Sequence, residues 1–401
     1  TDSINDFMLV DPMPQVRFVT NDSTQCFNIQ NFVFTDSSKI ASGSLSRNWS
    51  LSDGFTATTS TVNRVFTDDT TYTVKLVQIS DRGCSDSISK VMEVYSNPKS
   101  NFVINDTDQC LKQNNFVFTN TSTLAKGNLT HLWKFGDLQT STITGPAHRY
   151  FAYGNFTVTL VSTTDNGCVD STQKIIRVDA MPVVSFTIND TGQCINNQNF
   201  IFTNKSSIAV GTLQYLWKFG DATTSNLINP TKQFPVDTLY RVLLTATSNK
   251  GCKDSSSKII DVHPRPYSNF TINDSIQCLR GNNFIFTNKA KIQFKVRAGT
   301  LTYNWRLGDG NTSTSTNINH TYTNNGNFNV WLRATSDLGC VDSAFKVVTI
   351  GAMPNPSFTV NDPGQCFKIN KFGFTNKSTI ASGTQTYFWK FGDTDTLRAT
   401  N

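Results

Sequence analysis

Short stretches in which apolar and polar residues alternate recur along the whole chain, and each predicts a β-strand buried on one face. Residues 184–262 contain five of them: Val184–Ile188, Asn199–Thr203, Tyr215–Phe219, Leu239–Ala246 and Ser257–Val262. Turn residues separate the stretches, as in Asn249-Lys250-Gly251, where the glycine suits a positive φ. No stretch sustains the 3.6-residue period of a helix. The pattern therefore predicts a small all-β domain.

Three sequence markers repeat along the chain with a period of 84 residues, lengthened once to 88. A Gln-Cys pair ends at Cys26, Cys110, Cys194, Cys278 and Cys366, a Gly-Cys pair ends at Cys84, Cys168, Cys252 and Cys340, and a tryptophan stands at Trp49, Trp133, Trp217, Trp305 and Trp389. The four extra residues lie between Asn288 and Trp305. Internal repetition at this period indicates tandem copies of one domain.

The markers also predict the domain boundaries. We expect residues 1–14 to be the last strand of a preceding truncated repeat, and 15–98, 99–182 and 183–266 to be complete repeats. We expect 267–354 to be a repeat with a four-residue insertion and 355–401 to be a truncated repeat. Both ends then fall inside a repeat, which favours a segment of a longer array. The linkers are short and contain proline, which restricts hinge motion.

The residues around each tryptophan resemble a known family. The sequence Trp-Lys-Phe-Gly-Asp occurs at 133–137, 217–221 and 389–393, and a variant occurs at Trp305–Gly310. Together with the later Tyr-Gly-Asn-Phe at 153–156, it resembles the motifs of PKD (polycystic kidney disease) domains. The first repeat departs from the motif, with Trp49-Ser50-Leu51-Ser52-Asp53-Gly54. The resemblance implies tandem immunoglobulin-like β-sandwiches, which we expect to form an elongated rod.

The cysteine-containing additions to the motif narrow the resemblance. The Gln-Cys and Gly-Cys-x-Asp-Ser sequences are similar to tandem repeats of very large surface proteins of Bacteroidota, including gliding-motility adhesins and other type IX-secreted proteins. This resemblance implies an extracellular, cell-surface protein that acts as a structural and adhesive stalk. A carbohydrate-binding accessory array of a secreted hydrolase is the alternative.

Composition agrees with a folded, non-enzymatic repeat protein. The 30 phenylalanines and six tryptophans supply core material, and we expect Trp49, Trp133, Trp217, Trp305 and Trp389 to be core residues rather than ligand platforms. Only 16% of the residues are charged, for a net charge of +6, which argues against nucleic-acid binding. No catalytic set can be assembled, so we expect no enzyme activity. No apolar stretch reaches the roughly 18 residues of a membrane helix.

Few residues are candidates for binding. The recurring Asn-Asp pairs, as at 21–22 and 105–106, are typical of turns, and we expect no cofactor, with Ca²⁺ as the alternative ligand. The insertion is basic and aromatic, and it offers Lys291, Phe294, Lys295 and Arg297 as a loop for an anionic glycan or a partner protein. Neighbouring repeats of the same chain are the expected partners. Lateral self-assembly of the protein is a further alternative, because every repeat presents similar edges.

Nine cysteines at repeated positions predict disulfides and an oxidising compartment. One arrangement closes each repeat on itself: Cys26–Cys84, Cys110–Cys168, Cys194–Cys252 and Cys278–Cys340. In an immunoglobulin-like sandwich, however, Gln-Cys and Gly-Cys would lie at opposite ends, more than 20 Å apart. The favoured arrangement joins consecutive repeats: Cys26–Cys168, Cys110–Cys252 and Cys194–Cys340. Cys84, Cys278 and Cys366 would then pair with repeats outside this sequence.

Overall fold

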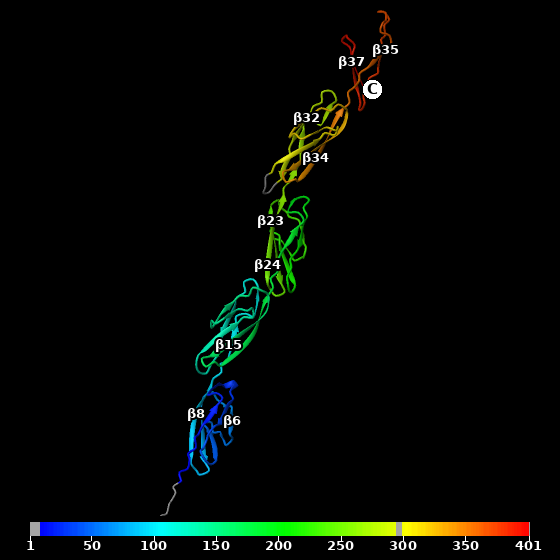
Figure 1. Ribbon diagram of the computed structural model, residues 1–401. Coiled ribbons are helices and arrows are strands. Elements are labelled where there is room, and N and C mark those ends of the chain that lie inside the picture. Colours follow the sequence, from blue (N-terminus) through cyan, green and yellow to red (C-terminus); the bar gives the residue numbers. More distant parts are fainter. Residues whose placement is uncertain (1–8, 294–298, 401) are drawn as a thin grey trace, which may run out of the picture. The chain divides into compact units, whose positions relative to one another are not determined.

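The computed structural model describes residues 9–293 and 299–400, and every repeat in it is built from β-strands (Figure 1). The first sandwich has a three-stranded sheet, in the order β1-β3-β6, that faces a five-stranded sheet, in the order β2-β8-β7-β4-β5. Figure 1 shows β6 and β8 on the two faces of this sandwich. The strands are β1 (Phe18–Thr20), β2 (Thr24–Cys26), β3 (Phe32–Asp36), β4 (Leu45–Leu51), β5 (Thr56–Ala57), β6 (Thr61–Arg64), β7 (Thr71–Ser80) and β8 (Ser85–Tyr95). A short 3-10 helix, η1 (Phe27–Ile29), follows β2.

The second and third sandwiches repeat this topology. Their three-stranded sheets are β14-β11-β9 and β17-β19-β22, and their five-stranded sheets are β10-β16-β15-β12-β13 and β18-β24-β23-β20-β21. The second comprises β9 (Phe102–Ile104), β10 (Asp108–Cys110), β11 (Phe116–Asn120), β12 (Leu129–Lys134), β13 (Thr140–Ser141), β14 (Ala147–His148), β15 (Gly154–Thr164) and β16 (Val169–Asp179). The third comprises β17 (Phe186–Ile188), β18 (Gly192–Cys194), β19 (Phe200–Asn204), β20 (Leu213–Lys218), β21 (Thr224–Ser225), β22 (Thr231–Lys232), β23 (Leu239–Ser248) and β24 (Lys253–His263).

The fourth sandwich has the same two sheets, β26-β28-β32 and β27-β34-β33-β30-β31, and an additional two-stranded sheet, β25-β29. Its strands are β25 (Arg265–Tyr267), β26 (Phe270–Ile272), β27 (Ile276–Cys278), β28 (Phe284–Asn288), β29 (Lys291–Gln293), β30 (Leu301–Arg306), β31 (Thr312–Ser313), β32 (Ile318–His320), β33 (Gly326–Ser336) and β34 (Val341–Gly351). Residues 355–401 contribute two hairpins, formed by β35 (Phe358–Val360), β36 (Phe374–Asn376), β37 (Thr386–Lys390) and β38 (Thr396–Thr400). The prediction of tandem immunoglobulin-like sandwiches is confirmed.

By its internal contacts the chain separates into two compact units. The first contains Thr1–Met181 with two short pieces of the third repeat, Ile208–Gly211 and Ser248–Cys252. The second contains the remaining parts of the third repeat and everything that follows it. Within the described residues, no helix is long and apolar enough to span a membrane.

Each of the four complete sandwiches has its own aromatic core. Trp49, Trp133, Trp217 and Trp305 are fully buried between the two sheets. In the second sandwich, the ring of Phe102 meets the indole of Trp133 edge to face, with centroids 5.1 Å apart. Edge-to-face contact of this kind adds to the gain from burying the rings. The cores therefore form where the repeated tryptophans and phenylalanines face inward.

Trp389 differs from the other four tryptophans, because it is only partly buried and the prediction of a core position is wrong for it. Residues 355–401 supply β37 and β38 around it, which pair with each other. In the complete sandwiches, two long strands such as β15 and β16 extend the sheet beside the tryptophan. The described residues that follow β34 include no counterpart of those two strands, so part of the indole is accessible to solvent.

The insertion of the fourth repeat begins as a strand. Lys291 lies in β29, which pairs antiparallel with β25, so that Tyr267 stands opposite Lys291 and Arg265 opposite Gln293. At the corresponding place, the other repeats have a single bridge, such as Val183 with Ser207. The insertion therefore lengthens an existing bridge by two residue pairs. Phe294, Lys295 and Arg297 of the proposed binding loop lie outside the described residues.

Candidate functional site

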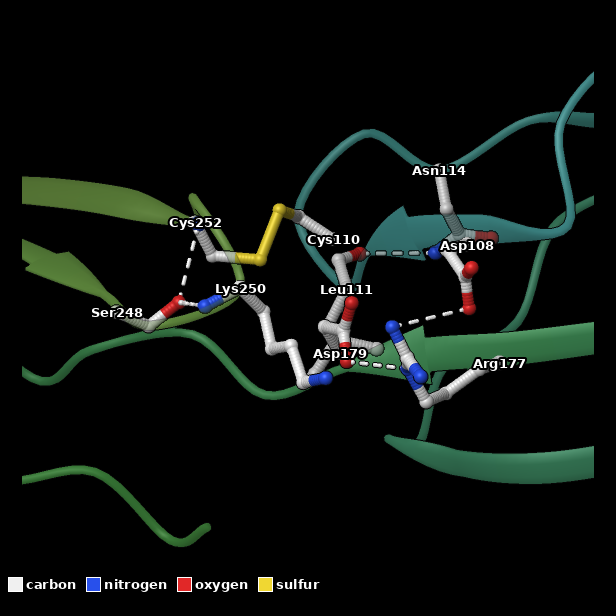
Figure 2. Close-up of a disulfide and its surroundings, with 9 residues drawn as sticks. All are labelled: Asp108, Cys110, Leu111, Asn114, Arg177, Asp179, Ser248, Lys250 and Cys252. Carbon is white, nitrogen blue, oxygen red and sulfur yellow. Dashed lines mark hydrogen bonds and ion pairs between the residues drawn. A yellow bond between two sulfur atoms is a disulfide. The ribbon is translucent and has the colours of Figure 1, made fainter. Parts of the chain in front are cut away.

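The Gln-Cys cysteines stand at the end of a short strand that sequence analysis did not find. In the second repeat, β10 pairs in parallel with the last part of β16, and Cys110 lies opposite Asp179. Figure 2 shows Arg177 between two carboxylates, those of Asp108 and Asp179, at 3.1 and 2.9 Å. The backbone N–H of Leu111 donates to the carbonyl of Asp179. These contacts hold Cys110 at the end of the sheet where β16 ends.

The Gly-Cys cysteines occupy the hairpin between the two longest strands. In the third repeat, Gly251 adopts a φ of +85°, which lets the chain turn, and Cys252 follows it. The Ser248 hydroxyl accepts hydrogen bonds from the N–H groups of Lys250 and Cys252, at 3.3 and 3.1 Å (Figure 2). A serine or threonine accepts from the cysteine N–H in the same way in the other three hairpins. The hairpin thus presents its cysteine in a defined geometry.

Three disulfides each join a Gln-Cys cysteine to the second Gly-Cys cysteine after it along the chain, in the following repeat. They are Cys26–Cys168, Cys110–Cys252 and Cys194–Cys340, each with Cα atoms 5.6 Å apart. Figure 2 shows the bond from Cys110 to Cys252. These three bonds are the pairs of the favoured arrangement from the sequence, in which consecutive repeats are joined.

The length of one strand explains why a repeat cannot close on itself. Cys110 lies beside Asp179 at one end of β16, whereas Cys168 directly precedes Val169 at the other end. An 11-residue strand rises about 3.3 Å per residue, so the two cysteines are roughly 35 Å apart. A disulfide requires Cα atoms within about 7 Å. Pairing within the repeat would therefore require the sandwich to unfold.

The remaining cysteines have free thiols in this structure. Cys84 is half-buried, and Cys278 and Cys366 are exposed. By contrast, Cys168, Cys252 and Cys340, the bonded members of the Gly-Cys set, are almost completely buried. Cys278 and Cys366 are accessible to a thiol partner from another repeat.

In each of the four complete sandwiches, a buried amide four residues after the Gln-Cys cysteine anchors the cysteine segment to the sandwich, and sequence analysis missed it. In the second repeat, the Asn114 amide donates to the carbonyls of Leu111 and Tyr150, both at 2.9 Å, and accepts from the N–H of Tyr150 at 2.8 Å. The same position holds Gln30, Gln198 and Asn282, which bond in the same way. An amide at a constant distance from the cysteine is a signal that the sequence does carry.

The aspartate of the Gly-Asp motif has a second role beside closing its turn. In the third repeat, one Asp221 oxygen accepts from the N–H of Thr223, and the other lies 2.8 Å from the Lys232 ammonium. The basic partner always stands 11 residues later and is Arg64, His148, Lys232 or His320. The pair links the turn after the tryptophan strand to a strand of the opposite sheet. This pairing explains why two of the four histidines share one position in the repeat.

We expect the third sandwich to lose stability in acid through Asp221. Burial alone would raise the pKa of Asp221, but hydrogen bonds from Lys232 and Thr223 and the charge of Lys232 outweigh it, so the pKa is lowered. A lowered pKa in the folded state stabilises the fold above about pH 4, and this contribution is lost as the pH falls through the folded pKa. Asp221→Asn should therefore cost about 1–3 kcal/mol at pH 7 and much less at pH 3. Urea titrations read out by amide exchange in β23 measure the difference.

Asp190→Asn is the matched control for this prediction, because Asp190 is an exposed turn carboxylate of the same repeat. Its replacement should change the stability little at either pH. An Asp221→Asn variant as stable as the parent at pH 7 would contradict the stabilising role of the pair.

The side chains of the Asn-Asp pairs form hydrogen bonds within their own repeats. In the first repeat, the Asn21 side chain donates to the carbonyl of Asn31 and accepts from the N–H of Val33, and Asp22 accepts from the N–H of Thr24. Among the described residues, Cys194, His263 and Cys340 form a group whose potential metal-binding atoms lie within 4.8 Å of one another. Two of these atoms are the sulfurs of a disulfide, which leaves them without thiolate character.

Comparison with known proteins places this geometry in a family. The sequence profile of the PKD domain matches residues 11–95, 96–178, 179–263 and 273–350. The pre-pro-metalloprotease PrtV of Vibrio cholerae is 43% identical over 70 residues, which is 16% of this chain and 8% of the protease. The crystal structure of the PKD1 domain from that protease is 32% identical, with a TM-score of 0.19, and the match covers 21% of this chain and 98% of the domain.

The match to a longer solved structure covers more of the chain. The N-terminal eight immunoglobulin domains of Down Syndrome Cell Adhesion Molecule are 11% identical, with a TM-score of 0.39, over 94% of this chain and 53% of theirs. PKD domains are non-catalytic modules that are typical of extracellular proteins. Four consecutive profile matches cover most of the sequence. The chain therefore belongs to the PKD domain family, as a tandem array of its repeats.

Proposed function

We propose that this chain is a structural and adhesive stalk segment of a large secreted cell-surface protein. Tandem PKD domains, which are typical of extracellular proteins, support this placement. The observation that carries the proposal is the pattern of the disulfides, in which each bond reaches from one repeat into the next. Disulfides of this kind persist in the oxidising environment outside the cell.

The three disulfides form overlapping loops along the chain. Each joins residues that are 142 or 146 positions apart, and each loop begins before the previous one ends. The linkers around Pro98, Pro182 and Pro266 therefore each lie inside a loop. A single proteolytic cut in any of these linkers leaves the two sides covalently joined. This property suits a protein that must survive outside the cell.

The overlap also shortens the path that carries a pulling force. A force that enters through Cys26–Cys168 passes along the backbone from Cys168 to Cys194, 26 residues later (194 minus 168), and continues through Cys194–Cys340. Fully extended, these 26 residues span about 90 Å, against about 290 Å for the 84 residues of a full period. Within the second sandwich this path is β16, an 11-residue strand that is already extended.

Single-molecule pulling on the whole chain tests the stalk proposal. With the disulfides intact, the distance between the bonds Cys26–Cys168 and Cys194–Cys340 should not exceed the extended length of the 26 residues that join them, about 90 Å, so the second and third repeats should give no large unfolding step. After reduction, each unfolded repeat should lengthen the chain by an amount that corresponds to about 84 residues. Equal increments before and after reduction would show that the disulfides do not carry the load. The stalk proposal would then lose its main support.

A further inference from the structure

The fourth sandwich exposes a stacked aromatic pair on its outer surface. Trp331 of β33 and Phe345 of β34 are cross-strand neighbours, with ring centroids 4.9 Å apart and planes inclined by 28°. Their exposed fractions are 42% and 57%. Trp331 is the tryptophan that falls outside the 84-residue register of the other five. Two large aromatic rings are therefore stacked on each other while both are partly exposed to solvent.

Polar and basic groups surround the pair. Arg306 of β30 stands opposite Trp331, and the next row of the same face places Asn304 beside Arg333. An open hollow on this face is lined by Asn304, Arg306, Trp331, Arg333, Thr335 and Ser343. Phe345 is not among the lining residues, and in the sheet it lies on the side of Trp331 opposite to Arg306.

The charge of this face has one sign. Every outward-facing side chain of β30, β33 and β34 is either neutral or an arginine. The acidic residue of these strands, Asp342, points to the opposite face of the sheet, where its carboxylate accepts a hydrogen bond from the N–H of Ser268. Among the described residues, neither Arg306 nor Arg333 has a carboxylate within ion-pair distance. Both guanidinium groups are thus available to an anionic ligand.

The other repeats show that the fold does not require these aromatics. The residues that take the place of Trp331 are Lys75, Thr159 and Leu243, and those that take the place of Phe345 are Ser89, Gln173 and Ser257. All three repeats form the same sheet without an aromatic pair. Exposing two large aromatic side chains adds nothing to the buried core, and such patches mark binding surfaces.

We propose that this face of the fourth repeat binds an acidic polysaccharide, a chain of pyranose rings that carries carboxylates. The apolar C–H face of a pyranose packs on the electron-rich face of an indole. Arg306 and Arg333 then meet the carboxylates, while Asn304, Thr335 and Ser343 supply hydrogen bonds to hydroxyls. The hollow is open rather than enclosed, which suits an extended polymer. The site goes beyond the stalk role and does not depend on it.

The topology argues against an acidic peptide as the ligand. Extended peptides bind β-sheets by pairing with the backbone of an edge strand. In the order β27-β34-β33-β30-β31, the central strand β33, which carries Trp331 and Arg333, pairs with β30 on one side and with β34 on the other at these positions. A peptide that lies over Trp331 and Arg333 therefore has no free backbone edge of β33 to pair with. A polysaccharide has no such requirement.

Binding of an oligogalacturonate to the complete 401-residue chain tests the proposal. The fully methyl-esterified oligosaccharide serves as the uncharged comparison, because it has the same sugar backbone. We expect saturable binding of the free acid, at least about tenfold weaker binding of the ester, and a similar loss in Trp331→Ala. Arg333→Gln should weaken binding of the acid and leave binding of the ester unchanged. Quenching of tryptophan fluorescence should accompany binding in the parent and be absent in Trp331→Ala.

Leu243→Ala is the matched control, since Leu243 occupies the position of Trp331 in the third repeat, and it should bind like the parent. The proposal is overturned if no binding of the acid is detected, or if Trp331→Ala binds as tightly as the parent. Equal binding of the ester would overturn the acidic specificity, and equal binding of polyglutamate would overturn the choice of a glycan. Association of the chain with itself through Trp331, detected by sedimentation, would make this face a contact between copies instead.

Discussion

Replacing Cys110 and Cys252 together by serine is expected to destabilise the second and third repeats by as much as about 5 kcal/mol. The bond between them closes a loop of 142 residues, and removing it returns that loop's conformational freedom to the unfolded chain. The full loss of unfolding free energy is expected when the second and third repeats unfold together. When one of the two repeats stays folded, it still restricts part of the loop, and the loss of unfolding free energy is smaller. Guanidinium titrations followed by amide exchange in β15 and β23 measure the effect in each repeat.

Cys84→Ser is the control for the disulfide prediction. Its thiol is free in the structure, so the substitution should leave the midpoint of the titration unchanged. Unreduced peptide mapping adds a second check, since a peptide that joins Cys110 to Cys168 is incompatible with the folded geometry. An unchanged midpoint in the double variant would contradict a stabilising role for the disulfide.

Trp133→Ala should unfold the second repeat or bring it close to unfolding. The side chain is fully buried, packs edge to face on Phe102 and donates from its indole N–H to the carbonyl of Ile143 at 2.9 Å. Truncating a buried tryptophan to alanine costs about 3–5 kcal/mol, and the loss of its hydrogen bond leaves a carbonyl without its partner. A small domain has only about 5–15 kcal/mol of stability to lose. Loss of amide protection in β11 and β15 measures the effect.

Two variants show whether burial is the cause. Trp133→Phe keeps most of the packing and loses the indole N–H, so its effect should be clearly smaller. Trp331→Ala removes an exposed tryptophan and should leave the stability of the fourth repeat almost unchanged. If Trp133→Ala and Trp331→Ala lowered the free energy of unfolding by the same amount, burial of the repeated tryptophans would not be what stabilises the cores.

The sequence alone was sufficient for the repeats, the all-β fold and most of the buried aromatics. These features depend on short-range patterns: strand alternation places Phe200 and Phe202 on one face, and the 84-residue period places a tryptophan in each copy. Trp389 is the exception, because burial also requires the two long strands, which the described residues after β34 do not include.

The tertiary structure decided which residues meet across long distances in the sequence. The cysteine pairs depend on the two ends of β16, which lie too far apart for a bond within one repeat. The pairing of Asp221 with Lys232 and the placement of Trp331 beside Phe345 depend on how strands are arranged in the two sheets. A local pattern determines which face a side chain takes, but its neighbours on that face come from strand order and register, and these are set by the packing of the whole sandwich.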